Sequence, residues 1–152
     1  MRPDPKPRTA LTYLLLIAYC LLLPSCSIPN LEPQDCIQAR DIVREFYSFH
    51  FGNEKEFSEE AIERRRPFFT PSFLRNLQSQ PPVVDPFTLT DDPPKAFRVG
   101  GCRVKEADRR VTFDVLLFWK TDIRTEQRSI AVEVENTDGK WMIDSVGDAN
   151  TF

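Results

Sequence analysis

One histidine and a cluster of three aspartates are the side chains in this sequence that we single out as candidates for proton transfer. The chain has one histidine, His50, in the stretch VREFYSFHF, and three aspartates, Asp85, Asp91 and Asp92, within residues 80–95. An imidazole acts as a general base only when a second group orients it and a substrate lies within hydrogen-bonding reach. The sequence identifies no orienting partner, so we predict that His50 is a packed structural residue, with a catalytic role as the alternative.

The three aspartates could also bind a cation, because Ca²⁺ prefers carboxylate and carbonyl oxygens. Their spacing lacks the alternate-residue ligand pattern of a calcium loop, and the prolines that directly follow Asp85 and Asp92 favour turns. We expect no metal and no cofactor. If the domain binds a small ligand or a partner, the candidate residues for that surface are Tyr47, His50, Asp85, Asp91, Asp92 and Trp119.

Residues 10–23, ALTYLLLIAYCLLL, form an apolar run after a short stretch of net positive charge. As a helix this run would be about 21 Å long, shorter than the ~30 Å hydrocarbon core of a bilayer. This length is typical of a secretory signal peptide. The following Leu-Pro-Ser-Cys, ending at Cys26, resembles the lipobox of bacterial lipoproteins, although Pro24 departs from the small residue usual at its position.

The lipobox resemblance implies that the chain is cut before Cys26 and that lipid is attached to this thiol. An ordinary secretory signal with a free or bridged Cys26 is the alternative. The predicted organisation is a signal peptide over 1–25, a tether over 26–34 and one domain over 35–152. We expect a lipid-anchored protein of the bacterial cell envelope. Ser27 after the anchor indicates the outer membrane if the host is Gram-negative.

The cysteine count then predicts one disulfide. Of the four cysteines, signal removal takes Cys20 and lipidation takes Cys26. Cys36 and Cys102 remain in an exported chain, where disulfides form and persist. A Cys36–Cys102 bridge is therefore predicted, and two buried reduced thiols are the alternative.

Three helices are predicted before the aspartate-containing stretch, and the first of them carries His50. Residues 35–51 have one apolar face, made by Ala39, Ile42, Val43, Phe46, Tyr47 and His50. Asp35 can cap this helix and Gly52 can end it. Two shorter helices are expected over 58–66 and 70–79, capped by Ser58 and Thr70. The Arg64-Arg65-Arg66 run is expected to be a solvated helix end.

The stretch 80–95 holds five prolines, so it is predicted to be a long irregular loop, and such loops are usually functional. Period-two patterns then predict strands over 96–106, 109–120, 126–136 and 140–147. A bulge at Gly100-Gly101 would keep both halves of the first strand on one face, and Asp138-Gly139 would make a hairpin turn. The core-facing residues of the bulged strand are then Phe97, Val99, Cys102 and Val104.

Helices followed by an antiparallel meander predict an α+β fold, with N-terminal helices packed on a curved four-stranded antiparallel sheet. The stretches VREFYSFHF, DPFTLTDD, VTFDVLLFW and DGKWMIDSVGD resemble the nuclear-transport-factor-2-like (cystatin-like, SnoaL-like) superfamily. More closely, the chain resembles a bacterial family of uncharacterised envelope proteins with that fold. The resemblance covers about residues 35–148. It implies a cone with a pocket at its open end but no particular reaction, because the superfamily includes enzymes, binding subunits and proteins without a pocket.

The outer face of the predicted sheet carries Asp114, Leu116 and Phe118. Apolar side chains on such a face indicate that something covers them. The resemblance implies a homodimer through this face, and the chain's own C-terminus is the alternative cover.

These observations favour a binding role over an enzymatic one. The net charge of −3 argues against a nucleic-acid-binding surface. We predict an envelope lipoprotein whose domain binds a partner protein or small ligand. One alternative is a small isomerase or lyase with His50 in the cone pocket. Another is an inhibitor or immunity-type protein that acts through the 80–95 loop.

Overall fold

The structure, a computed structural model, describes residues 32–53, 58–79, 82–105, 109–123 and 125–149. They belong to the second of two compact units, which spans Glu32–Phe152. The predicted signal peptide, the lipobox and Cys26 lie outside the described residues. In the part of the chain that is described, no helix combines the length and the apolar character needed to cross a bilayer.

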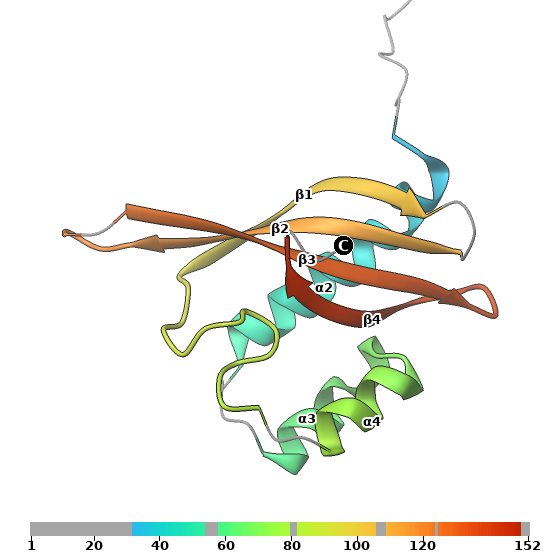
Figure 1. Ribbon diagram of the computed structural model, residues 1–152, viewed down its shortest axis with the longest axis horizontal. Helices are drawn as coiled ribbons and strands as arrows, with labels where there is room; N and C mark the ends of the chain where they lie inside the picture. Colours follow the sequence, from blue (N-terminus) through green and yellow to red (C-terminus); the bar gives the residue numbers. More distant parts are fainter. Residues whose placement is uncertain (1–31, 54–57, 80–81, 106–108, 124, 150–152) are drawn as a thin grey trace, which may run out of the picture. The chain divides into compact units, whose positions relative to one another are not determined.

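The first described helix, α2, spans Gln34–Gly52 (Figure 1). It is amphipathic as predicted. The predicted cap is wrong: Pro33 occupies the N-cap position, no side chain caps the helix, and Asp35 lies in the first turn. A carboxylate in the first turn still complements the positive end of the helix dipole. The buried face is made by Cys36, Ala39, Val43, Phe46, Tyr47 and His50.

Two short helices follow, α3 over Glu59–Arg65 and α4 over Pro71–Ser79, joined by a 3₁₀ turn η1 over Arg66–Phe68. Both predicted caps are confirmed. The Ser58 hydroxyl accepts a hydrogen bond from the Ala61 amide at 3.1 Å, and the Thr70 hydroxyl accepts one from the Phe73 amide at 3.2 Å. Satisfying these amides stabilises helices that are too short to form alone.

Four strands form one antiparallel sheet in the order β1-β2-β3-β4: β1 spans Ala96–Lys105, β2 Arg110–Lys120, β3 Thr125–Thr137 and β4 Lys140–Asp148. The pairing of β1 with β2 shifts between Val99 and Cys102, so the predicted bulge is confirmed. Asp138 and Gly139 both have positive φ, 53° and 86°, as a tight hairpin turn between twisted strands requires. The α+β prediction is thereby confirmed.

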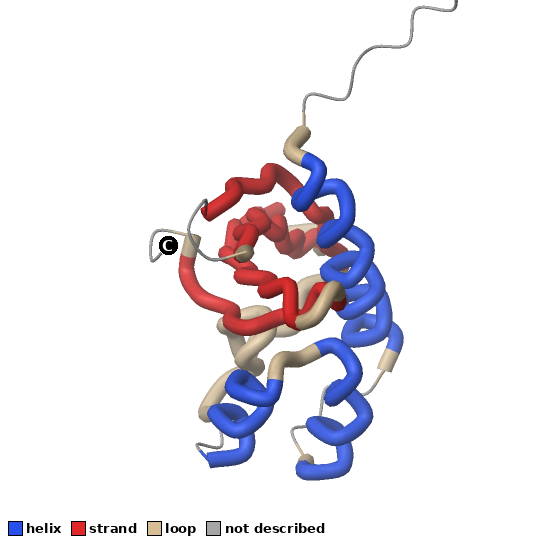
Figure 2. The backbone as a smooth tube through the Cα atoms, turned by 90° about the vertical axis from the view of Figure 1, so that its right-hand side faces the viewer, coloured by secondary structure: helices blue, strands red, loops and turns tan. Residues whose placement is uncertain are grey.

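The sheet curls, and α2 runs along it (Figure 2). The apolar face of α2 and the inward side chains of the sheet form one hydrophobic core. From β2 and β3 this core includes the fully buried Val111, Phe113, Val115, Leu117, Ile130, Val132 and Val134. The burial of branched and aromatic side chains between α2 and the sheet is the main source of the stability of the domain.

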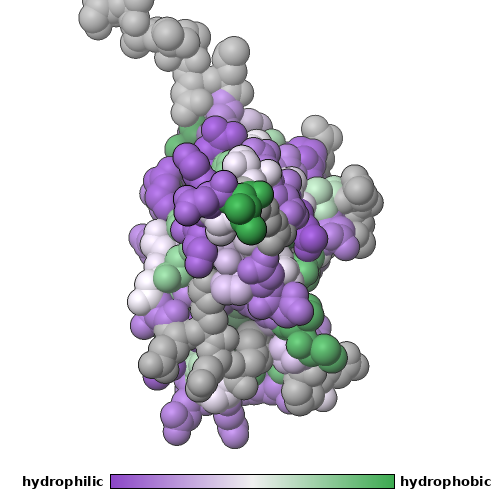
Figure 3. Space-filling view, turned by 90° about the vertical axis from the view of Figure 1, so that its left-hand side faces the viewer, coloured by the Kyte–Doolittle hydropathy of each residue, from purple (hydrophilic) through white to green (hydrophobic). Residues whose placement is uncertain are grey.

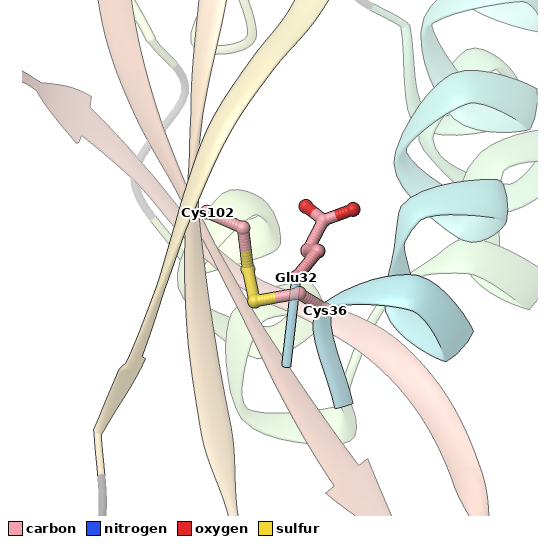
Figure 4. Close-up of side chains that lie close together, drawn as sticks. All are labelled: Glu32, Cys36 and Cys102. Atoms are coloured by element: carbon pink, nitrogen blue, oxygen red, sulfur yellow. A yellow bond between two sulfur atoms is a disulfide. The ribbon is translucent and has the colours of Figure 1, made fainter. Parts of the chain in front are cut away.

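A disulfide fastens α2 to the sheet (Figure 4). It joins Cys36, in the first turn of α2, to Cys102, which follows the bulge in β1, with Cα atoms 5.9 Å apart. The bulge turns Cys102 toward the core side, where the helix can reach it. This is the pair expected from the cysteine count.

Candidate functional site

The loop between α4 and β1 folds back on itself instead of running freely across the surface. Asp85 pairs with Thr90 as an isolated antiparallel bridge, and the Leu89 amide donates to the Asp85 carbonyl at 2.8 Å. Residues 86–89 form the turn between them, with Leu89 at a φ of 54°. The loop therefore has its own backbone hydrogen bonds and a fixed shape.

His50, from the last turn of α2, contacts this loop through Asp85. The Nε2 atom of His50 lies 2.8 Å from Oδ2 of Asp85, and the other carboxylate oxygen accepts a hydrogen bond from the Phe87 amide at 2.9 Å. Burial opposes ionisation of this carboxyl group, but the hydrogen bonds that it accepts from His50 and from the Phe87 amide outweigh this effect. The pKa of Asp85 consequently lies below its ordinary value.

Arg65 lies on the other side of the imidazole, so that Asp85, His50 and Arg65 form a row of hydrogen-bonded polar groups, which we call the polar chain. Its Nη2 atom lies 3.3 Å from Nδ1 of His50, and Nη1 donates to the Ala61 carbonyl at 2.8 Å. A guanidinium can only donate, so Nδ1 is the acceptor and the imidazole proton resides on Nε2, facing Asp85. Burial lowers the pKa of Arg65, while the charge of Asp85 opposes that change.

The position of Arg65 corrects the expectation of a solvated arginine run, because its exposure is only 3%. The spacing of Ala61, Ile62 and Arg65 could have revealed this, since positions i, i+1 and i+4 share one face of a helix. The same spacing explains why only the middle arginine of the three turns inward. The partnership of Arg65 with His50 was not predicted from the sequence.

Aromatic rings enclose the polar chain. The Phe46 ring stacks on the His50 ring with centroids 5.8 Å apart, and the Phe87 ring meets His50 edge-on at 5.2 Å. The Arg65 guanidinium lies over the Phe49 ring at 5.7 Å. His50 is 1% exposed and both of its ring nitrogens have protein partners, so this arrangement offers a substrate no free imidazole nitrogen.

Tyr47 and Trp119 support the loop at two further points. The Tyr47 hydroxyl donates to the Phe87 carbonyl at 2.8 Å, and the Trp119 indole donates to the Asp92 carbonyl at 2.9 Å. Burial raises the pKa of Tyr47, and the nearby charge of Asp85 raises it further. Of the six predicted surface residues, Tyr47, His50 and Trp119 are therefore buried supports beneath the loop.

The loop presents a hollow of about 250 Å³, with walls that include Val83, Val84, Asp85 and Asp91. Val83 is 100% exposed and Val84 40%, which is unusual for aliphatic side chains. Figure 3 shows small hydrophobic patches on an otherwise hydrophilic face of the molecule. We call Val83, Val84, Asp85, Asp91 and Asp92 the loop surface.

The three aspartates are not arranged as a common cation site. The Asp85 carboxylate is turned toward His50, whereas Asp91 and Asp92 are exposed. Among the residues that the structure describes, the group close enough to be considered for a metal is Glu32, Cys36 and Cys102. Its sulfur atoms form the disulfide and so are not thiolate ligands, and Glu32 pairs with Arg40.

The predicted dimer face has polar contacts within the chain. Asp114 accepts a hydrogen bond from Arg103 at 2.8 Å, and Leu116 and Phe118 are half-buried. A dimer through these residues stays a prediction.

No protein-family model and no curated protein matches the chain. Among solved structures, it resembles a protein of unknown function from Bacteroides thetaiotaomicron, with 20% identity and a TM-score of 0.52 over 72% of this chain and 90% of that one. It also resembles a chain of the type VI effector–immunity complex Tae3–Tai3 from Ralstonia pickettii, with 16% identity and a TM-score of 0.55 over 74% and 96%. The Ntf2-like potential transfer protein TraM from the Gram-positive conjugative plasmid pIP501 matches with 19% identity and a TM-score of 0.49 over 76% and 96%. At these identities, the first two likenesses show a shared fold and nothing more.

Proposed function

We propose that this protein is a bacterial envelope lipoprotein whose domain binds a partner protein through the loop surface. The observation that carries the proposal is the pair of exposed valines, Val83 and Val84, beside a carboxylate that His50 holds in place. An ordered loop loses little conformational entropy on binding, which favours recognition. Burying one valine side chain contributes roughly 1.5 kcal/mol or more.

A protein partner fits this surface better than a small ligand. The hollow of about 250 Å³ is smaller than the ~300–1,000 Å³ typical of small-molecule sites. Val83 and Val84, which line the hollow, are exposed, so a partner's surface would cover them. The carboxylates of Asp91 and Asp92 beside the valines call for a complementary patch with apolar and cationic side chains.

An immunity-type role, in which the domain would inhibit its partner protein, is a second candidate form of this binding. The chain shares its fold with a chain of an effector–immunity complex, which makes an immunity-type role a specific candidate. Such a role predicts one-to-one binding that weakens as salt is raised, because the contacts of Asp91 and Asp92 would be screened. Binding that is insensitive to salt would contradict the electrostatic part of this proposal.

The membrane anchor is a separate part of the proposal. Its support is the lipobox resemblance that ends at Cys26. Intact mass spectrometry of the protein extracted from its own envelope should show a chain that begins at Cys26 and carries the mass of diacylglycerol. A mature chain without lipid would contradict the anchor but would leave the loop proposal standing.

Site-specific photo-crosslinking tests the loop surface directly. A photoreactive amino acid at Val83 should give one discrete crosslinked product in envelope extracts, whereas the same amino acid at exposed Glu60 of α3 should not. Val83→Ser should weaken binding of the identified partner about tenfold or more, from lost apolar burial. Ile123→Ser is the matched control, since Ile123 is also almost fully exposed, at 98%. Equal products from Val83 and Glu60 would overturn the proposal.

A further inference from the structure

A second hollow, of about 380 Å³, lies where η1, α4 and the start of β4 meet. Its floor is apolar and includes Phe69 and Leu74, which are 2% and 6% exposed, together with Met142. Three cationic side chains stand around it: Arg66, Arg75 and Lys140. We call this hollow the basic groove.

Backbone and side-chain hydrogen bonds connect the segments that form the basic groove. Phe69 pairs with Ile143 as an isolated parallel bridge, and the Thr70 amide donates to the Ile143 carbonyl at 2.9 Å. The Thr70 hydroxyl donates to Asp144 at 2.6 Å, so the start of α4 is fixed to β4. The shape of the groove is therefore present before anything binds.

The charge around the basic groove differs from that of the chain as a whole. The chain has a net charge of −3, yet none of the residues that line the groove is acidic. Arg66 is paired with Glu63 at 2.5 and 2.6 Å. Arg75 is exposed and has no ion pair with any described residue, so its guanidinium can receive an anion from solution.

We propose that the basic groove binds a small organic anion with an apolar body and a carboxylate head. The carboxylate would lie against Arg75 and Lys140, where a guanidinium can donate two parallel hydrogen bonds. The apolar body would cover Phe69, Leu74 and Met142. The volume of the groove falls in the range of ~300–1,000 Å³ that is typical of small-molecule sites.

This site is independent of the loop surface, which consists of other residues and carries the opposite charge. Neither proposal requires the other. Loss of anion binding would leave the Val83 crosslink unchanged, and loss of that crosslink would leave anion binding unchanged.

Methionine methyl NMR of the mature chain, with decanoate as the probe below its micelle concentration, tests the proposal. Of the two methionines of the sequence, Met1 belongs to the predicted signal peptide and Met142 lines the groove, so a Met142→Leu variant assigns the reporter signal. Decanoate should shift the Met142 methyl signal saturably. Arg75→Ala should weaken this binding about tenfold or more, as expected for a lost charge-assisted hydrogen bond.

Three controls distinguish specific binding of the carboxylate from non-specific binding to an apolar surface. Arg98→Ala removes an exposed arginine of β1, outside the residues that line the groove, and should leave the decanoate affinity unchanged. Decanol and decyltrimethylammonium have the same apolar body without the carboxylate, so they should bind at least tenfold more weakly. The proposal would be wrong if the Met142 shift did not saturate or if decanol bound as tightly as decanoate. It would also be wrong if Arg75→Ala and Arg98→Ala changed the decanoate affinity equally.

Discussion

The Nε2 atom of His50 lies 2.8 Å from Oδ2 of Asp85, although 35 positions separate the two residues in the chain. This contact joins the last turn of α2 to the loop surface. Arg65 occupies the other ring nitrogen, so a neutral imidazole connects a cation to an anion. The charges at the two ends offset each other inside an aromatic enclosure, which explains how three polar groups are tolerated there.

Replacing Asp85 should lower stability in a pH-dependent way. Asp85→Ala leaves the His50 Nε2–H group and the Phe87 amide without their acceptor, which should cost about 2 kcal/mol of unfolding free energy at pH 7. The folded pKa of Asp85 is below the ordinary value of 3.8, so its contribution is fully present above pH 3.8 and is lost as the pH falls through the folded pKa. Urea unfolding of both proteins at pH 7 and below pH 3.8 should show a smaller difference in acid. A difference that is constant or larger in acid would contradict the ionised assignment.

His50 and Arg65 should be energetically coupled. His50→Ala removes the acceptor of the Arg65 Nη2 group and the donor to Asp85, so it should cost about 3 kcal/mol. Once His50 is absent, Arg65→Ala should cost less than it does in the wild type. A double-mutant cycle by urea unfolding should give a coupling free energy of about 1 kcal/mol or more. Additive effects would show that the two side chains act independently.

The elements of the fold could be predicted from the sequence because local patterns determine them. Alternation in β2, the Gly100-Gly101 bulge and the caps at Ser58 and Thr70 depend on neighbouring residues. The N-terminus of α2, which has no side-chain cap, is an exception, because its local pattern predicted a cap at Asp35. Asp35 is a good capping residue, yet the helix begins one position earlier, because Pro33 offers its carbonyl to the Ile37 amide.

The arrangement of the candidate site could not be predicted in the same way. His50, Arg65 and Asp85 come from three separate segments, and their contacts depend on how α2, α3 and the loop pack together. The types of residue indicated a possible acid–base group. Only the packing shows that its nitrogens face protein partners, and that Tyr47 and Trp119 lie beneath the loop instead of on its surface.

Tyr47→Phe should loosen the loop without disturbing the core. Tyr47 is fully buried and its hydroxyl donates to the Phe87 carbonyl at 2.8 Å. Phenylalanine keeps the ring but leaves that carbonyl without its donor, which should cost about 1–2 kcal/mol. Hydrogen exchange should show faster exchange of the Leu89 amide, whereas amides of β2 and β3 should show only the global change. Equal acceleration at all sites would mean that the loop has no separate opening.

Reduction of the disulfide should destabilise the domain strongly. Cys36 and Cys102 are 66 positions apart, and the chain-entropy model gives about 4 kcal/mol for closing a loop of this size. Urea unfolding with and without dithiothreitol should show this loss in the wild type. The Cys36→Ala, Cys102→Ala double variant is the control, since dithiothreitol should not change its unfolding. An unchanged wild-type midpoint after verified reduction would contradict the prediction.

Gly100 and Gly101 form a matched pair that tests the bulge in β1. A Cβ atom at Gly100 would lie 2.9 Å from the Asp114 carbonyl oxygen and 3.3 Å from a Leu116 methyl carbon, so backbone would have to move. A Cβ atom at Gly101 would have its nearest contact at 3.5 Å, an ordinary van der Waals distance. Gly100→Ala should therefore destabilise the domain by about 1–3 kcal/mol, as overpacking does. Gly101→Ala should be neutral or slightly stabilising, because alanine restricts the unfolded chain. Urea unfolding measures both variants, and equal losses would show that bulge flexibility, and not the close approach of β2, is what requires glycine here.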